Sequence, residues 1–375
     1  MRIGIDATAL PPQPVGAGNY IIQLIRALSA LDTGDELVVF VQEKGLELIG
    51  KKECLKFEWV IVRDLEPAAR LIWEQVGFPG LVRQSKVDLL HSLHYTRPLW
   101  LPCKSVVTFH DLTFFLFPEL HTRARRFFFP LAIRASARLA QALIADSEST
   151  RQDAIRLLHI APAKIQTALL GVDPTFRKID DTGQLQRIRA KYQLPEHFIL
   201  YVGLVEPRKN LPGLINSYKD LVGEGIDHDL VIVGRSGWSS GAVFSQVEAL
   251  GLNQRVRFTG YVDQHDLPLV YNLASLFVYP TRYEGFGLPV LEALACGTPV
   301  ITTNASSLPE IVGDAGILIP PDDAGALLKA MHRVLEDPEL MADLSARGMK
   351  RAKGFTWERT ALQTRQVYRQ LCELN

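Results

Sequence analysis

The part of the sequence that decides the fold is YEGFGLPVLEA, residues 283–293. It follows an apolar run of strand length, residues 276–280, and continues into a segment of helical composition, residues 290–295. Proline is favoured at the start of a helix because its missing N–H is not needed there, so Pro289 places the helix start just after Gly287. The motif therefore predicts a strand, a glycine-rich turn and a helix in succession.

The predicted turn has the features of an anion site. The N–H groups of Phe286, Gly287 and Leu288 have no acceptor inside the helix, and such amides at a helix N-terminus favour a phosphate. Glu284 lies in the turn and Glu292 lies about one turn into the helix. A carboxylate beside a phosphate is repulsive unless it serves another group, and sugar hydroxyls suit it because they donate hydrogen bonds. The motif favours a nucleotide sugar as ligand, with an ordinary turn and surface glutamates as the alternative.

Composition indicates a globular protein with two domains, since 375 residues are many for a single core. Hydrophobic residues make up 47% of the chain, and the formal net charge is +0, which gives no global attraction to nucleic acid. The 4 cysteines form no Cys-x-x-Cys pair, and no apolar run is long enough to span a membrane. Without a signal peptide at the N-terminus, we expect a cytoplasmic protein.

Apolar runs of strand length alternate with helix-length amphipathic segments, which predicts an α/β fold of parallel sheets covered by helices. We expect strands near residues 3–6, 37–41, 59–62, 89–91, 105–109 and 142–145 and, in a second series, near 198–203, 230–233, 256–258, 276–279, 299–302 and 316–319. Two series imply two doubly wound units. The breakers at residues 171–174 and the polar stretch 177–193 between the series indicate the domain boundary.

With the CGTPVI that follows at residues 296–301, the motif resembles the donor-site signature of retaining family 4 glycosyltransferases of the GT-B fold. The hallmark of that family is two glutamates separated by seven residues, as Glu284 and Glu292 are. The resemblance implies two Rossmann-like domains facing across a cleft: an acceptor-side domain, residues 1–175, and a donor domain, residues 176–356. It also implies that a last helix, 357–375, packs back on the first domain.

The resemblance assigns roles to the residues of this motif. It implies that Glu284 contacts the donor sugar near the reacting carbon, so that we count it as catalytic, and that Glu292 binds the ribose hydroxyls. The amides of Phe286, Gly287 and Leu288 would hold the diphosphate.

A second motif is GLVEPRKN, residues 203–210, directly after a predicted strand. Two adjacent cations at a strand end can neutralise a diphosphate and stabilise it as it leaves. The resemblance implies that Arg208 and Lys209 do this. Some members of the family carry a further arginine directly after the first glycine, where this chain has Leu204, so the pair must suffice.

A third motif is PVGAGNY, residues 14–20, between the first strand and a helix expected at 20–31. It fails the dinucleotide fingerprint because Ile21 stands where a small residue is needed. The resemblance implies that Gly16 and Gly18 lie against the donor diphosphate or the acceptor. A turn that only lets the helix pack is the alternative.

Another candidate is His110 in TFHDL, residues 108–112, just past a predicted strand. The resemblance implies that His110 hydrogen-bonds the donor sugar, and we count it as catalytic; Asp111 would orient it or cap a helix. The loops after strands 230–233 and 256–258 supply Gly234, Tyr261 and Val262. By resemblance the second loop, with Tyr261 and Val262, takes up the nucleobase largely through backbone groups. We count Gly234 in the same region and expect it to let the ligand approach closely.

We expect no metal and no cofactor beyond the donor substrate. Asp227-His228-Asp229 has the Asp-x-Asp form that metal-dependent glycosyltransferases use, but it precedes a strand and so lies at the amino end, away from the expected ligand edge. We interpret it as a surface turn. Arg208, Lys209 and the helix amides would then replace the metal.

Residues 121–138 combine aromatic residues with arginines and contain no acidic residue. Two interpretations stand equal. The segment could contact an anionic membrane surface or a lipid-diphosphate acceptor, or it could be a core helix with its aromatics inside and its arginines in solvent. The first interpretation would place the protein at the inner face of the membrane.

These observations predict a retaining hexosyltransferase that moves a hexose from a nucleoside-diphosphate sugar to a hydroxyl of a glycan or lipid-linked glycan. The pattern of residues 1–20 and the context of His110 resemble family members that use GDP-mannose more than those that use UDP-glucose. The resemblance also implies a cell-envelope or O-antigen polysaccharide as acceptor and a front-face route without a carboxylate nucleophile. A retaining glycosidase would need two carboxyl groups flanking the bond, and no placed aspartate is an evident nucleophile. Two alternatives remain open: a nucleotide-sugar epimerase of the same fold and a non-catalytic nucleotide-sugar-binding module.

Overall fold

The computed structural model describes residues 1–50, 57–235 and 240–373. The chain divides into two compact units, one formed by Met1–Gly171 with Thr356–Asn375 and the other by Val172–Phe355. The unit boundary therefore lies just before Val172, within the run of breaker residues. The sequence analysis expected it a few residues later, after residue 175.

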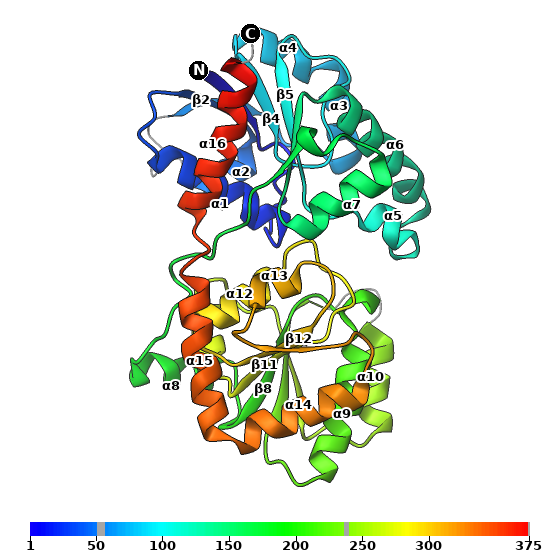
Figure 1. Ribbon diagram of the computed structural model, residues 1–375, viewed down its shortest axis with the longest axis vertical. Helices are drawn as coiled ribbons and strands as arrows, with labels where there is room; N and C mark the ends of the chain where they lie inside the picture. The colour runs from blue at the N-terminus through cyan, green and yellow to red at the C-terminus, as the bar shows by residue number, and fades with distance from the viewer. Residues whose placement is uncertain (51–56, 236–239, 374–375) are drawn as a thin grey trace. The chain divides into compact units, whose positions relative to one another are not determined.

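The first unit is built on a seven-stranded sheet in the order β3-β2-β1-β4-β5-β6-β7, with every neighbouring pair parallel. Its strands are β1 (Arg2–Asp6), β2 (Glu36–Gln42), β3 (Phe57–Val62), β4 (Leu89–Ser92), β5 (Lys104–Phe109), β6 (Ala142–Ala145) and β7 (Ile165–Thr167). Strand β7 was not predicted, because it has only 3 residues and two of them are polar. The sheet is covered by helices on both faces, as Figure 1 shows.

The second unit is built on a six-stranded parallel sheet in the order β10-β9-β8-β11-β12-β13. Its strands are β8 (Phe198–Val202), β9 (Asp229–Val233), β10 (Val256–Gly260), β11 (Leu276–Tyr279), β12 (Val300–Thr303) and β13 (Ile317–Ile319). All strands predicted from apolar runs are present. Such runs are recognisable because strands of a parallel sheet are buried on both faces, as in β8 and β11, where every residue is buried.

Helices connect the strands in both units. In the first unit they are α1 (Ala17–Ala30), α2 (Glu43–Ile49), α3 (Pro67–Val76), α4 (Phe78–Gln84), α5 (Thr113–Leu116), α6 (Arg123–Leu139), α7 (Glu148–Leu158) and the last helix, α16 (Trp357–Glu373). In the second unit they are α8 (Thr182–Lys191), α9 (Leu211–Gly223), α10 (Ser240–Ala249), α11 (Leu267–Leu273), α12 (Leu288–Ala295), α13 (Leu308–Val312), α14 (Ala324–Glu336) and α15 (Pro338–Ala352).

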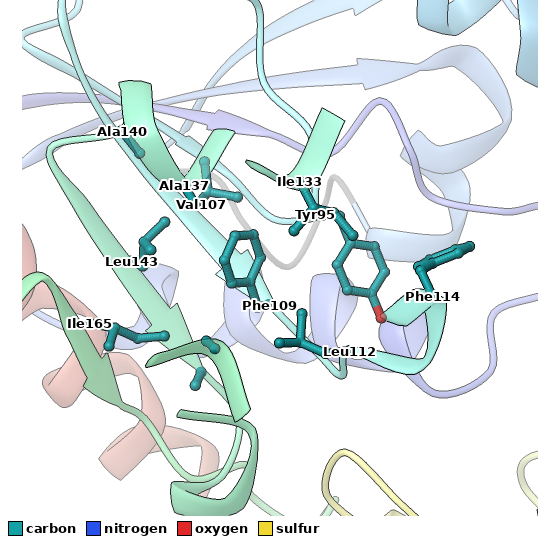
Figure 2. Close-up of a cluster of buried hydrophobic side chains, with 12 residues drawn as sticks. Tyr95, Val107, Phe109, Leu112, Phe114, Ile133, Ala137, Ala140, Leu143 and Ile165 are labelled. Atoms are coloured by element: carbon teal, nitrogen blue, oxygen red, sulfur yellow. The ribbon is translucent and has the colours of Figure 1, made fainter. Parts of the chain in front are cut away.

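One hydrophobic core of the first unit lies between β5, β6 and the helices α6 and α7. Figure 2 shows Phe109 of β5 facing Leu143 of β6, with Ile133 and Ala137 of α6 closing over them. Phe109, Leu143 and Ile133 have no solvent exposure. This packing fixes the end of β5, and with it the position of the residue that follows, His110.

The last helix, α16, packs on the first unit beside α1 (Figure 1). The buried hydroxyl of Tyr368 hydrogen-bonds with Nδ1 of His91 at 2.6 Å. Nearer the surface, Arg365 donates to Asp35 at 2.6 Å, and Asp35 also pairs with the N-terminal ammonium at 3.3 Å. A buried hydrogen bond and a shared carboxylate thus tie the end of the chain to its beginning.

Gly171 is needed where α16 begins. A Cβ at this position would lie 2.2 Å from the backbone nitrogen of Trp357 and 2.5 Å from the carbonyl carbon of Thr356. Neither backbone atom can move aside as a flexible side chain would. We therefore expect Gly171→Ala to lower the free energy of unfolding by about 1–3 kcal/mol in urea denaturation followed by circular dichroism.

Gly223→Ala is the matched control, because a Cβ there meets nothing within 4 Å at the end of α9. Alanine is the better helix former, so this variant should equal the wild type or exceed it by up to about 1 kcal/mol. Equal urea midpoints for the two alanine variants would show that the start of α16 does not depend on Gly171.

Candidate functional site

The candidate site of the second unit lies where its strand order reverses, between the neighbouring strands β8 and β11 (Figure 1). In open parallel sheets, ligands bind at the carboxyl ends of the strands at such a point. The loop after β8 carries Arg208 and Lys209, and the loop after β11 carries Glu284. Sheet topology thus brings together three predicted residues that are far apart in the sequence.

Glu284 is the centre of this cluster. Its Oε1 atom lies 2.9 Å from Nη1 of Arg208 and 2.7 Å from Nζ of Lys209, and it accepts a hydrogen bond from the hydroxyl of Tyr279 at 2.9 Å. Lys209 also donates to the Tyr279 hydroxyl. Because these contacts converge on Oε1, Oε2 is the oxygen with the capacity to meet a ligand.

The charge of Glu284 is stabilised although the residue is only 9% exposed. Burial by itself would raise the pKa of Glu284, but the charges of Arg208 and Lys209, together with the hydrogen bonds, lower it to about 2. Burial lowers the pKa of Lys209, against the attraction of Glu284. Glu284 lies between two cations, and Arg208 also pairs with Glu206 at 3.3 Å, so the two cations of this cluster face two carboxylates.

Two serines hold the loop of Glu284 in place. The backbone N–H of Glu284 donates to the hydroxyl of Ser306 at 2.8 Å, and the hydroxyl of Ser307 donates to the carbonyl of Glu284 at 3.0 Å. Sequence reasoning missed both serines and Tyr279. They could have been found from topology, because Ser306 and Ser307 follow β12, the strand next to β11.

The predicted helix start after Gly287 is confirmed, since α12 begins at Leu288 and Gly287 is its N-cap residue. Gly287 has φ of 112°, in the region that favours glycine. Within the described residues, no group accepts a hydrogen bond from the N–H of Phe286, Gly287 or Leu288. These three amides are therefore available to an anion at this turn.

Glu292 lies on α12 in a separate hydrogen-bonded pair, with the hydroxyl of Tyr271 donating to its Oε2 at 3.0 Å. Its environment is the reverse of that of Glu284. Burial raises the pKa of Glu292 to about 7, and the hydrogen bond from Tyr271 only partly opposes this shift. The two glutamates of the motif thus differ in charge near neutral pH, one ionised and one close to its midpoint.

The predicted nucleobase region lies after β9 and β10. Tyr261 is 48% exposed, with the guanidinium of Arg235 at 4.8 Å from its ring centroid, whereas Val262 is buried. A Cβ at Gly234 would lie 2.0 Å from the carbonyl oxygen of Gly203. The close approach that requires a glycine at position 234 is therefore to the β8 loop, which accounts for this residue without a ligand.

In the first unit, His110 follows β5 and pairs with Asp146, which follows the adjacent strand β6. His110 Nδ1 lies 2.7 Å from Asp146 Oδ2, and Nε2 lies 2.9 Å from the carbonyl oxygen of Leu93. Burial disfavours the imidazolium, but the Asp146 carboxylate and the hydrogen bonds raise the pKa of His110 above its ordinary value. Asp146 was missed, and Asp111 instead accepts hydrogen bonds from Thr113 at the start of α5.

The prediction that Gly18 lies in a loop before a helix at 20–31 is wrong, because α1 already begins at Ala17. A Cβ at Gly18 would lie 2.9 Å from Cβ of Pro14, so this glycine lets the preceding loop pack against the helix. Gly16 is the N-cap residue of α1 with φ of 51°, and a Cβ there would meet nothing within 4 Å. Contact of either glycine with a diphosphate stays a prediction.

The Asp-x-Asp segment has another partner. Asp227 and Asp229 lie 3.2 Å and 3.1 Å from nitrogen atoms of Arg255, at the amino end of β9. Among the described residues, no group of three or more His, Cys, Asp or Glu side chains could hold a metal ion. Within residues 1–50, 57–235 and 240–373, no helix is both long enough and apolar enough to cross a bilayer.

Comparison with known proteins agrees with this architecture. Residues 14–176 match the model of the family described as Glycosyltransferase Family 4, and residues 185–351 match that of Glycosyl transferases group 1. The chain is 35% identical to the O-antigen chain mannosyltransferase B of Escherichia coli over 95% of this chain and 96% of the relative. The chain belongs to glycosyltransferase family 4.

Further similarities are more distant or partial. The serotype-specific mannosyltransferase WbdA of Escherichia coli is 32% identical over 70% of this chain and 33% of its own length. The fold matches sucrose-phosphate synthase from Thermosynechococcus elongatus with a TM-score of 0.78 and 23% identity, covering 100% of both chains. This family 4 glycosyltransferase therefore has the GT-B fold, with two parallel sheets and their covering helices.

The opposite environments of Glu292 and Glu284 predict opposite pH effects on stability. The folded pKa of Glu292, about 7, exceeds the ordinary value of 4.5, so its contribution to the free energy of unfolding falls as pH rises between these values. Glu292→Gln should therefore raise the free energy of unfolding at pH 8 by up to about 3 kcal/mol, and raise Tm with it. At pH 4.5 the substitution should change both quantities little.

The contribution of Glu284 to stability changes with pH in the opposite direction. Its folded pKa, about 2, lies below 4.5, so its stabilisation is present above pH 4.5 and is lost as pH falls toward 2. Glu284→Gln should lower Tm at pH 8, the more so because it leaves buried Lys209 without its carboxylate. The measurement is Tm by calorimetry from pH 2.5 to 8.5. An effect of Glu284→Gln that is as large at pH 2.5 as at pH 8, or an effect of Glu292→Gln that is the same at pH 4.5 and pH 8, would contradict the assignment.

Proposed function

We propose that this protein transfers a hexose from a nucleoside-diphosphate sugar to a hydroxyl of a glycan or lipid-linked glycan, with retention of anomeric configuration. The observation that carries the proposal is the cluster at the ends of β8 and β11, where Glu284 shares one carboxylate oxygen with Arg208 and Lys209. The cations and the nearby amides of α12 suit a diphosphate, and the second oxygen of Glu284 suits a sugar hydroxyl.

In the proposed reaction the bond between the anomeric carbon and the diphosphate oxygen breaks. The acceptor oxygen forms its bond to the same face of that carbon, and its proton passes to an oxygen of the departing diphosphate. Arg208, Lys209 and the amides of residues 286–288 stabilise the charge that develops on the leaving group. No carboxylate nucleophile is required, so Glu284 acts by orienting the sugar. Both ring nitrogens of His110 are engaged within the first unit, by Asp146 and by the carbonyl of Leu93, so its contact with the sugar stays a prediction outside this proposal.

Ribose recognition is assigned to Glu292. An ionised carboxylate accepts hydrogen bonds from two adjacent hydroxyls, whereas the neutral form offers less acceptor capacity. Since the pKa of Glu292 is about 7, bound ribose would favour the ionised form and lower this pKa. Tyr271 then serves to orient the carboxylate from the adjacent helix.

We propose mannose as the hexose and GDP-mannose as the donor. The support is the 35% identity over nearly the whole chain with an O-antigen chain mannosyltransferase, together with the motifs at the N-terminus and around His110. A cell-envelope polysaccharide is the proposed acceptor on the same grounds. The reaction is proposed to need no metal, because Arg208, Lys209 and the α12 amides supply positive charge at the diphosphate.

A nucleoside diphosphate should stabilise the protein if this assignment is correct, and the base should matter. In a thermal-shift screen, we expect GDP and GDP-mannose to raise Tm and UDP and UDP-glucose to leave it unchanged, since binding to the folded state alone stabilises it. A shift with uridine compounds only would reject the mannose donor, and no shift with any nucleotide would reject the donor site. An epimer formed from donor alone would favour the epimerase alternative.

Lys209→Met should lower kcat by roughly 100-fold, because it removes one fixed cation from the leaving group. Arg282→Ala is the matched control, since Arg282 lies in the same loop as Glu284 but pairs with Asp322 in solvent. Transfer should be measured by release of nucleoside diphosphate at saturating donor.

Loss of folding must be separated from loss of catalysis in this experiment. Lys209→Met leaves buried Glu284 with one cation fewer, and the double variant Lys209→Met with Glu284→Gln removes that imbalance. We expect the double variant to recover Tm relative to Lys209→Met, but to transfer more slowly than Glu284→Gln alone. Equal transfer by the double variant and by Glu284→Gln would show that Lys209 acts only on stability.

A further inference from the structure

Helix α6 presents large apolar side chains to solvent. Phe127 is 73% exposed and Leu131 is 68% exposed, and Phe128 of the same helix is also exposed. Only its other side packs into the core, through Ile133 and Ala137 (Figure 2). The core-helix interpretation of this segment therefore holds for one face of α6 and fails for the other, which needs another explanation.

The exposed face also carries positive charge. Residues 127, 131, 134 and 138 follow helical spacing and so share one face, with Phe127 and Leu131 in its middle and Arg134 and Arg138 toward its C-terminal end. Arg123 adds a cation at the N-terminal end, and α6 contains no acidic residue. Cations that flank an apolar centre, on a helix that itself carries no carboxylate, are complementary to an anionic and partly apolar surface.

A groove adjoins the C-terminal end of α6. It has a volume of about 420 Å³ and is lined by Arg134, Arg138, His159 and Lys164, with apolar residues between them and no acidic residue. It lies at the amino-terminal end of the sheet, because α6 leads into the start of β6 and Lys164 precedes the start of β7. The groove is therefore distinct from the carboxyl edge, where His110 lies.

A second exposed apolar group lies on α3 and the segment after β4. Trp100 is 60% exposed, and Ile72 and Val76 of α3 and Leu99 are exposed as well. The backbone N–H of Leu99 donates to the side chain of Gln75 at 2.8 Å, so this segment lies against α3. A tryptophan among exposed aliphatic residues is typical of a side chain that sits at a membrane interface.

Helices α3 and α6 flank one segment of the chain. Glu74 of α3 accepts a hydrogen bond from Thr96 at 2.9 Å, and the ring of Phe129 in α6 lies 6.5 Å from that of Tyr95. Because Tyr95 and Thr96 are adjacent, the two exposed apolar groups belong to neighbouring elements of the first unit.

The geometry points to a membrane-docking face formed by α6 and the Trp100 segment, which binds the surface of an anionic phospholipid bilayer. Phe127, Leu131 and Trp100 enter the interface between headgroups and acyl chains, while Arg123, Arg134 and Arg138 pair with lipid phosphates. A nucleic acid would use the arginines but leave the apolar centre in water. This inference concerns a different surface from the proposed donor site and does not depend on the identity of the nucleotide.

The test is co-sedimentation of the full chain with vesicles, either phosphatidylglycerol and phosphatidylcholine mixed 1:1 or phosphatidylcholine alone. We expect binding to the anionic vesicles, stronger by tenfold or more, and weaker at high salt. Phe127→Ser with Leu131→Ser should weaken binding by roughly tenfold or more at any salt concentration. Each of Arg123→Gln and Arg138→Gln should weaken it about fivefold at low salt.

Leu362→Ser is the matched control, because Leu362 is 49% exposed on α16 of the same unit. It should bind vesicles as the wild type does, and all variants should retain their Tm and their thermal shift with nucleotide. Trp100 fluorescence, taken as the difference from a Trp100→Phe variant, should move to shorter wavelength on vesicle binding.

Several outcomes would overturn the inference. These are equal binding to both vesicle types, equal loss in the Leu362→Ser control, or binding to DNA that survives Phe127→Ser with Leu131→Ser while vesicle binding is absent. Loss of nucleotide-induced stabilisation in the wild type would instead reject the proposed donor site and leave the membrane test unaffected.

Discussion

The candidate site of the second unit depends on compensation of the buried charge of Glu284. A buried carboxylate is stable as an ion only if fixed positive charge compensates for lost hydration, and a buried lysine has the same need in reverse. Arg208 and Lys209 meet that need from one loop and Glu284 from another. Glu206 also pairs with Arg208 at 3.3 Å, so two cations face two carboxylates. What the turn offers to an anion is therefore the N–H groups of residues 286–288, which have no acceptor among the described residues.

The two glutamates of the motif show how position alone sets chemistry. Both are about equally buried, at 9% and 8% exposure, yet the pKa of one is about 2 and that of the other about 7. The difference lies in their partners, two cations for Glu284 and a neutral hydroxyl for Glu292. Environments that separate the pKa values of neighbouring carboxyls are typical of sites that bind or react. A sequence spacing cannot contain this information, because it does not say which side chains approach.

Much of the fold could be predicted because parallel strands are buried on both faces and read as apolar runs. β7 could not, since its few residues alternate with polar ones. The site was predictable where the chain itself keeps residues together, as in the turn of Gly287. Partners from other strands were missed: Asp146 for His110, and Ser306 for Glu284. Each follows a strand next to that of its partner, so only strand order, which no local pattern fixes, could have revealed it.

Helix α6 connects the packing around His110 with the exposed apolar face of the first unit. On its inner side, Phe129 packs near Tyr95, whose ring in turn lies 5.6 Å from that of His110. On its outer side, the same helix exposes Phe127 and Leu131 between arginines. A displacement of α6 at its outer face would therefore reach the ring of Tyr95 next to His110, because closely packed side chains transmit displacement. The exposed apolar side chains in the middle of this outer face are those that the proposed membrane-docking face would bury.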